Sequence, residues 1–103
     1  MVVTTTEIIP GRDYEIIGMV KGSTVQTVNA IRDIGASFRT IVGGEVKKYN
    51  EMVSKARDLA MSRMVEEAAS CGADAVVSIR FGTSSIMQGA AEVMVYGTAV
   101  KFK

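Results

Sequence analysis

A long amphipathic pattern that ends at a glycine and turns directly into a strand constrains the fold of this chain most. From Glu45 to Cys71, small and apolar residues recur at spacings of three and four, and charged residues occupy the opposite side. Gly72 follows at the position where helices end in a left-handed residue, and the next segment, DAVVSIRF, alternates as a strand does. The pattern predicts a helix over 45–71, its C-terminal cap, and a strand over 74–87.

A helix of this length is difficult to fit into a single small domain. At a rise of about 1.5 Å per residue, residues 45–71 would form a rod about 40 Å long. A compact domain of roughly 100 residues has a radius of gyration of only about 13 Å. We therefore expect the helix to overhang its own sheet or to be shared with a neighbouring subunit.

Two further stretches favour long strands. Residues 14–28 alternate loosely and are interrupted by Gly18 and Gly22, so we expect a strand that bends or bulges at a glycine. Residues 91–103 carry apolar side chains on both faces, whereas a strand with one wet face would alternate with polar residues. Residues 2–9 favour a short additional strand, and the segment GTSS predicts a bulge within the strand that follows the long helix.

The order of these elements predicts an α+β fold in one domain, residues 1–103. A shorter helix is expected near 30–42, where apolar residues also recur every three or four positions. The helical crossover from the strand at 14–28 to the strand at 74–87 is right-handed and parallel in almost all proteins. Placing the last strand, 91–103, between them gives a two-layer β-α-α-β-β arrangement, with a three-stranded sheet of order 1-3-2 and the long helix on one face. The other face is apolar, and we expect self-association to cover it.

Composition and charge remove several classes of partner. The net charge is +1 with the signs interleaved, which gives no electrostatic reason to expect nucleic acid or an anionic membrane surface. No apolar run approaches the ~20 residues that a spanning helix needs, and no signal-peptide pattern follows Met1. A single cysteine cannot form an intrachain disulfide, so we expect a cytoplasmic protein.

The absence of histidine removes the commonest catalytic and metal-binding arrangements. No Ser-His-Asp triad, Cys-His pair or imidazole metal site can form within one type of chain. Metal sites for soft cations need several thiolates or imidazoles, and Cys71 supplies one thiolate; we expect it to act as a small buried hydrophobe. The sequence thus predicts no enzyme, no cofactor and no metal site.

One segment, SFRTIVGGEVKKY, could bind a ligand. Gly43 and Gly44 precede the long helix, whose free backbone N–H groups can bind an anion, and Arg39 and Lys47 are close in sequence. The alternative is a purely structural corner in which glycine supplies a positive φ, and Glu45 would itself repel an anion. These five residues are the candidate anion- or ligand-binding site, and the structural corner is the commoner meaning of such a glycine pair.

Three segments carry a family likeness: DIGASFRTIVGGEVKKY, KARDLAMSRMVEEAASCGADAVVSIRF and EVMVYGTAVKF. Together they resemble the YbjQ-like family of small uncharacterised bacterial and archaeal proteins, over essentially the whole chain. The resemblance implies a dodecin-subunit-like fold assembled as a homopentamer. The family is sometimes labelled heavy-metal-binding, but it has no established catalytic or metal-binding residues to carry over to this sequence.

We therefore expect a soluble, non-catalytic oligomer, a pentamer in view of the resemblance, that binds a small molecule between its subunits. The alternative is a heavy-metal-binding protein, as the family label suggests, although the ligand residues for it are missing. An enzyme built on the glycine corner ranks last, because the sequence places no acid–base pair there.

Overall fold

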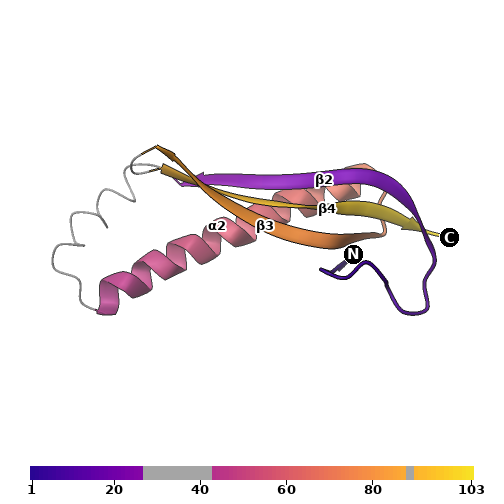
Figure 1. Cartoon of the computed structure of the whole chain (residues 1–103), viewed down its shortest axis with the longest axis horizontal. Helices are drawn as coiled ribbons and strands as arrows, with labels where there is room; N and C mark the ends of the chain where they lie inside the picture. Colours follow the sequence, from indigo (N-terminus) through magenta and orange to yellow (C-terminus); the bar gives the residue numbers. More distant parts are fainter. Residues whose placement is uncertain (27–42, 88–89) are drawn as a thin grey trace.

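A long helix lies against a four-stranded sheet in the part of the chain that the structure describes, residues 1–26, 43–87 and 90–103 of a computed structural model. The elements are, in chain order, β1 (Val2–Val3), β2 (Tyr14–Gln26), α2 (Gly43–Ser70), β3 (Ala75–Met87) and β4 (Ala90–Phe102). Figure 1 shows α2 running along the three long strands, with its first turns extending past the strand ends. The fold is α+β, as predicted.

The sheet is mixed and has the order β1-β3-β4-β2. β4 is antiparallel to both of its neighbours, and β1 is parallel to β3. The last strand does lie between the other two long strands, but the predicted three-stranded sheet is one strand short. Val2 and Val3 add to the outer edge of β3, opposite Ala75 and Val76.

Three register shifts change which face the strand residues occupy. The β2–β4 register shifts between Ile16 and Gly18, so the predicted bulge at a glycine is confirmed. The β3–β4 register shifts before and directly after the segment GTSS, which differs from the single bulge predicted within it. At the first shift Ser78 has a φ of 55°, and this extra residue places Ile79 on the α2 side of the sheet, opposite to the side that Val77 occupies.

The helix ends with the glycine cap that the sequence predicts. Gly72 has a φ of 77°, its amide donates to the carbonyl of Ala69 at 3.0 Å, and the amide of Ala73 donates to the carbonyl of Ala68 at 3.1 Å. This pair of bonds is a Schellman motif, which satisfies the last carbonyls of the helix. Cys71 lies in the turn and is exposed, so the prediction that it is buried is wrong.

The boundaries of the helix also differ from the prediction. α2 begins at Gly43 and ends at Ser70, whereas the sequence predicted 45–71. The radius of gyration is 16.9 Å, larger than the about 13 Å of a compact domain of this size, because the helix overhangs the sheet. The shorter helix predicted near 30–42 lies outside the described residues.

The main core lies between α2 and the sheet. Small helix residues and Met64 meet residues of the long strands, and the predicted apolar face of the helix is confirmed at Ala56, Ala60, Met64 and Ala68. The buried members are Val20, Ala56, Ala60, Met64, Ala68, Val76, Ile79, Val93, Val95 and Ala99.

α2 packs mainly on β2 and approaches it most closely at Gly22. A Cβ atom at Gly22 would fall against the carbonyl oxygen of Ala60 and 2.5 Å from the amide nitrogen of Met64. The backbones of the helix and the strand are therefore in direct contact, which only glycine in the strand permits.

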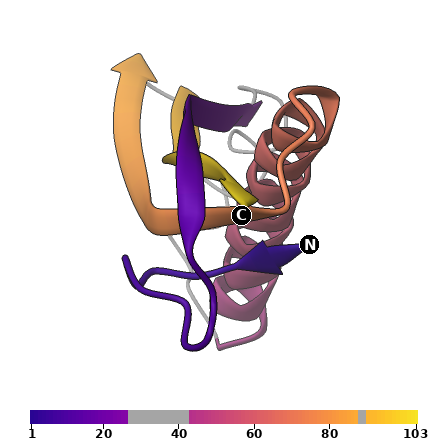
Figure 2. The ribbon, with the colours of Figure 1, turned by 90° about the vertical axis from the view of Figure 1, so that its right-hand side faces the viewer.

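A smaller core occupies one end of the opposite face. Ala75, Val77 and Val100 are buried there under Ile9, Tyr14 and Phe102. The Tyr14 hydroxyl donates to the carbonyl of Glu7, which fixes the N-terminal segment. Figure 2 shows this segment passing beside the start of β3. The chain's own N-terminus thus covers part of the face predicted to need a partner, and Tyr96, further along β4, stays exposed.

The contact at Gly22 predicts a large effect of one added methyl group. Gly22→Ala should lower the free energy of unfolding by about 3 kcal/mol, because the helix must move away from the strand. Gly82→Ala is the matched control, since its nearest heavy atom would be the Met94 methyl carbon at 4.0 Å, and it should change stability by less than about 0.5 kcal/mol. Urea unfolding measures both; equal, small effects would contradict the close approach.

Candidate functional site

The predicted glycine corner lies at the start of α2. Gly43 and Gly44 are the first residues of the helix rather than a turn ahead of it, and Glu45 and Lys47 follow within its first two turns. Arg39 and the side chains of Glu45 and Lys47 lie outside what the structure describes. The anion site at this corner therefore stays a prediction.

β2 is an edge strand, with β4 on one side and none of the described strands on the other. Arg63 Nη1 on α2 donates to the carbonyl oxygen of Ser23 at 2.6 Å, so this carbonyl points away from β4. Backbone groups in an antiparallel strand alternate in direction from residue to residue. Met19, Lys21, Ser23 and Val25 therefore direct their N–H and C=O groups outward, and we call these four residues the open edge of β2.

Apolar side chains flank this edge. Ile16 is 71% exposed, Met19 69% and Val25 48%. Edge strands in stable monomers are usually protected by charged residues, prolines or a covering segment. Between Ile16 and Gln26 the only charged residue is Lys21. Lys21, the bulge between Ile16 and Gly18 and the bond from Arg63 to Ser23 therefore give the open edge of β2 only partial protection against pairing with another chain.

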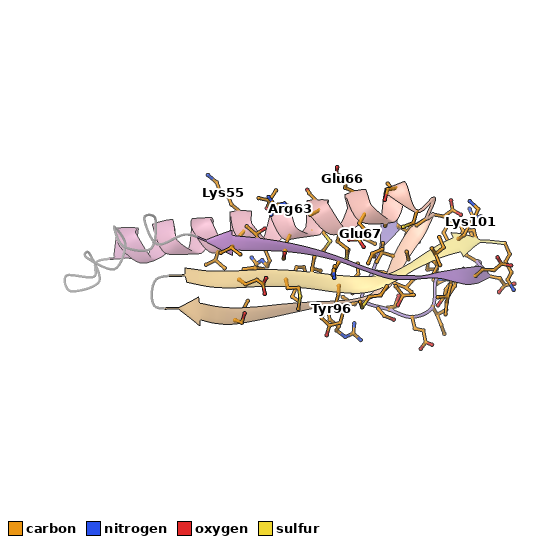
Figure 3. All side chains as sticks on the ribbon, turned by 90° about the horizontal axis from the view of Figure 1, so that it is seen from above. Lys55, Arg63, Glu66, Glu67, Tyr96 and Lys101 are labelled. Atoms are coloured by element: carbon orange, nitrogen blue, oxygen red, sulfur yellow. The ribbon has the colours of Figure 1, made fainter. Side chains whose placement is uncertain are left out.

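A cleft of about 350 Å³ opens along the same edge. It is lined by Lys21, Gly22, Ser23, Arg63, Glu67 and Met94. Figure 3 shows Arg63 and Glu67 on the part of α2 that lies over the strands. Two cationic side chains and one carboxylate around a small cleft suit an anionic or zwitterionic small molecule.

Sequence reasoning missed this cleft because its residues belong to separate patterns. Lys21 lies in the first long strand and Arg63 in the helix, and no motif connects them. Only the close approach of α2 to Gly22 brings them together. The available signal was Gly22 itself, since a glycine inside a strand often marks the close approach of another backbone.

A second cleft, of about 340 Å³, lies beside the N-terminal segment. Its lining includes Arg12 and Lys103 but also Glu7 and Asp13, so the opposite charges offset one another. The Arg12 guanidinium lies 4.8 Å from the centroid of the Phe102 ring and is already engaged in a cation–π contact. This arrangement secures the N-terminal segment rather than offering a charge to a ligand.

The described residues hold neither a metal-binding cluster nor a spanning helix. Across residues 1–26, 43–87 and 90–103, no group of three or more His, Cys, Asp or Glu side chains is placed to hold a metal ion. In the same part of the chain, no helix is long and apolar enough to cross a membrane.

Comparison with known proteins gives matches over the whole chain. The family model YbjQ_1, described as "Putative heavy-metal-binding", matches residues 1–103. A UPF0145 protein of Clostridium novyi is 56% identical over 101 residues, with 98% of each chain covered. A UPF0145 protein of Thermotoga maritima is 51% identical over 104 residues, covering 100% of this chain and 98% of the relative.

A solved structure has the same fold. A protein of unknown function from Pediococcus pentosaceus, described as a member of the DUF74 family, superposes with a TM-score of 0.71 at 20% identity. The match covers 100% of this chain and 98% of that one. At this identity the likeness concerns the fold alone.

The bond from Arg63 to Ser23 predicts a measurable contribution to stability. Arg63→Met keeps most of the apolar stem and should lower the free energy of unfolding by about 1 kcal/mol, because the bond to the Ser23 carbonyl is lost. Arg57→Met is the matched control on the same helix, since among the described residues Arg57 donates to the nearby Ser54 hydroxyl, and it should cost less than about 0.5 kcal/mol. Equal losses in urea unfolding would mean that Arg63 does not hold the edge.

Proposed function

The chain belongs to the YbjQ_1 family of UPF0145 proteins, and from this premise we propose that it is a non-catalytic homo-oligomer that binds a small molecule between its subunits. The observation that carries the proposal is the open edge of β2 with its exposed Ile16, Met19 and Val25. An edge of this kind favours pairing with another chain.

A second copy of the chain is the best-supported cover for this edge. Burial of apolar surface contributes roughly 25 cal/mol per Å², so covering several exposed aliphatic side chains favours association. Identical copies are always present together, and cyclic symmetry can close them into a ring that leaves no open edge. A homopentamer is the ring size that the family resemblance implies.

The proposed ligand position follows from the position of the cleft. Lys21 and Ser23 belong both to the open edge of β2 and to the lining of the cleft. A copy that covers this edge would convert the open cleft into an enclosed site between subunits, where Arg63 and Lys21 could bind a phosphate or carboxylate group. The glycine corner at Gly43 and Gly44 is the second candidate position.

Heavy-metal binding, which the description of the family model names, receives less support. Soft cations need several thiolate or imidazole ligands. This chain has one cysteine and no histidine, and the one thiol is exposed at the end of α2.

We expect native mass spectrometry at micromolar concentration to give one oligomer, a pentamer on the family resemblance. Met19→Lys should shift the mass to that of the monomer, because it places a charge where a dry contact is proposed. Ser62→Lys adds the same charge at an exposed position of α2 and should leave the oligomer intact. A monomeric parent protein, or an unchanged mass for Met19→Lys, would overturn the proposed assembly.

Inorganic phosphate is the probe for the ligand site. Millimolar phosphate should raise the Tm of the parent protein by about 4 °C, since a ligand that binds only the folded state stabilises it. Arg63→Met should abolish the shift if the cleft binds the anion, and Arg39→Ala should abolish it if the glycine corner does. The absence of any shift in the parent protein would count against an anion site at either position.

A further inference from the structure

The sheet has a second open edge, on β3, and we propose that β2 of one copy adds in parallel to residues 80–87 of β3 in the next copy. The sheet would then continue from subunit to subunit. This inference rests on the proposed function, because it names the surfaces through which that oligomer forms.

The edge of β3 is covered only along its first half. The amide of Thr4 donates to the carbonyl of Val76 at 3.0 Å, and the amide of Ile79 donates to the carbonyl of Thr4 at 3.1 Å. None of the described strands pairs with the outer side of residues 80–87. β1 lies parallel to β3, so the chain's own N-terminus shows that this edge accepts a parallel strand.

The directions of the two strands fit such a pairing. β2 and β3 are both antiparallel to β4 and hence parallel to each other. When two copies lie side by side with their α2 helices on the same side of the continued sheet, β3 of one copy therefore runs parallel to β2 of the other. The pairing is head-to-tail, so it joins two different surfaces and can close into a ring.

The backbone groups on the two edges also have the required phase. Because the Ser23 carbonyl points away from β4, the backbone groups of Gly22 point toward β4, where Gly22 is opposite Val95. The neighbours of Val95, Met94 and Tyr96, therefore direct their backbone groups toward β3, opposite Gly82 and Arg80. On β3, Phe81 and Thr83 accordingly direct their backbone groups outward, away from β4. Phe81 and Thr83 are opposite Val95 and Val93, whose side chains are in the core under α2, so the side chains of Phe81 and Thr83 also lie on the α2 side of the sheet. The side chains of the open edge of β2 lie on the other side. In a parallel pair with aligned faces, the bonding residues of the two strands must lie on opposite faces.

Apolar side chains meet on both faces in this arrangement. Phe81 of one copy, 46% exposed, would lie beside β2 of the next copy, on the side of the sheet that α2 covers. Leu59 of that next copy is 43% exposed and lies one turn before Arg63 on the side of α2 that faces the β2 edge. Ile16 is opposite Val100, Val100 is opposite Ala75, and Ala75 is opposite Val2, so Ile16 and Val2 lie at the same level along the strands. The next copy would therefore bring its exposed β1 valines beside Ile16. Both contacts remove apolar surface that a single chain leaves in water.

Cross-linking between two singly substituted proteins tests the pairing. In a Cys71→Ser background, Val25→Cys marks β2 and Ser84→Cys marks β3; both positions are opposite Glu92 and exposed. The two proteins are unfolded, mixed, refolded together and treated with a short bismaleimide. Each chain holds one cysteine, so no cross-link within a chain can form. We expect cross-linked dimers in the mixture and none in either protein alone.

The controls separate this inference from the proposed function. Ser62→Cys on the exposed side of α2, mixed with Val25→Cys, should give no dimers. Dimers from either single protein would mean that like edges meet, which overturns the pairing. An intact oligomer in native mass spectrometry without cross-links in the mixture would overturn the pairing and leave the proposed oligomer standing. A monomer would overturn both.

Discussion

The direct contact between the backbones of α2 and β2 at Gly22 is the interaction on which the rest of the structure depends. Gly22 and Ala60 let the helix lie closest to the edge strand rather than to the middle of the sheet. This position buries Val20 and Met64 but leaves Phe81, on the far strand, exposed on the side that faces the helix. It also brings Arg63 over the edge, where it bonds to Ser23 and lines the cleft.

The two edges of the sheet differ in how much of each is paired with another strand. The N-terminal segment covers the start of β3 and buries Val77 and Val100 on the face away from α2. None of the described strands pairs with the open edge of β2 or with the outer side of residues 80–87 of β3. The overhanging helix and the two unpaired edges of matching direction are the features on which the proposed ring of subunits rests.

Local patterns in the sequence predicted most of the fold, and tertiary contacts account for what they missed. Periodicity located Ala56 and Met64 in the core and Gly72 at the helix cap, because those positions follow from helix geometry alone. A short strand was predicted within residues 2–9, but its pairing with β3 was missed, because a strand of two residues carries no pattern that identifies its partner. The cleft was missed because Lys21 and Arg63 meet only through the packing of α2 on β2. The anion site predicted at the glycine corner stays a prediction, since Arg39 lies outside the described residues.

Amide hydrogen exchange along β2, followed residue by residue by NMR, tests most directly whether its edge is covered. In a lone chain the even-numbered amides of residues 20–24 bond to β4, and the odd-numbered amides of residues 21–25 face solvent. If a second copy covers the edge, both sets should exchange slowly at micromolar protein concentration. Fast exchange confined to residues 21, 23 and 25 would show an open edge and contradict the account.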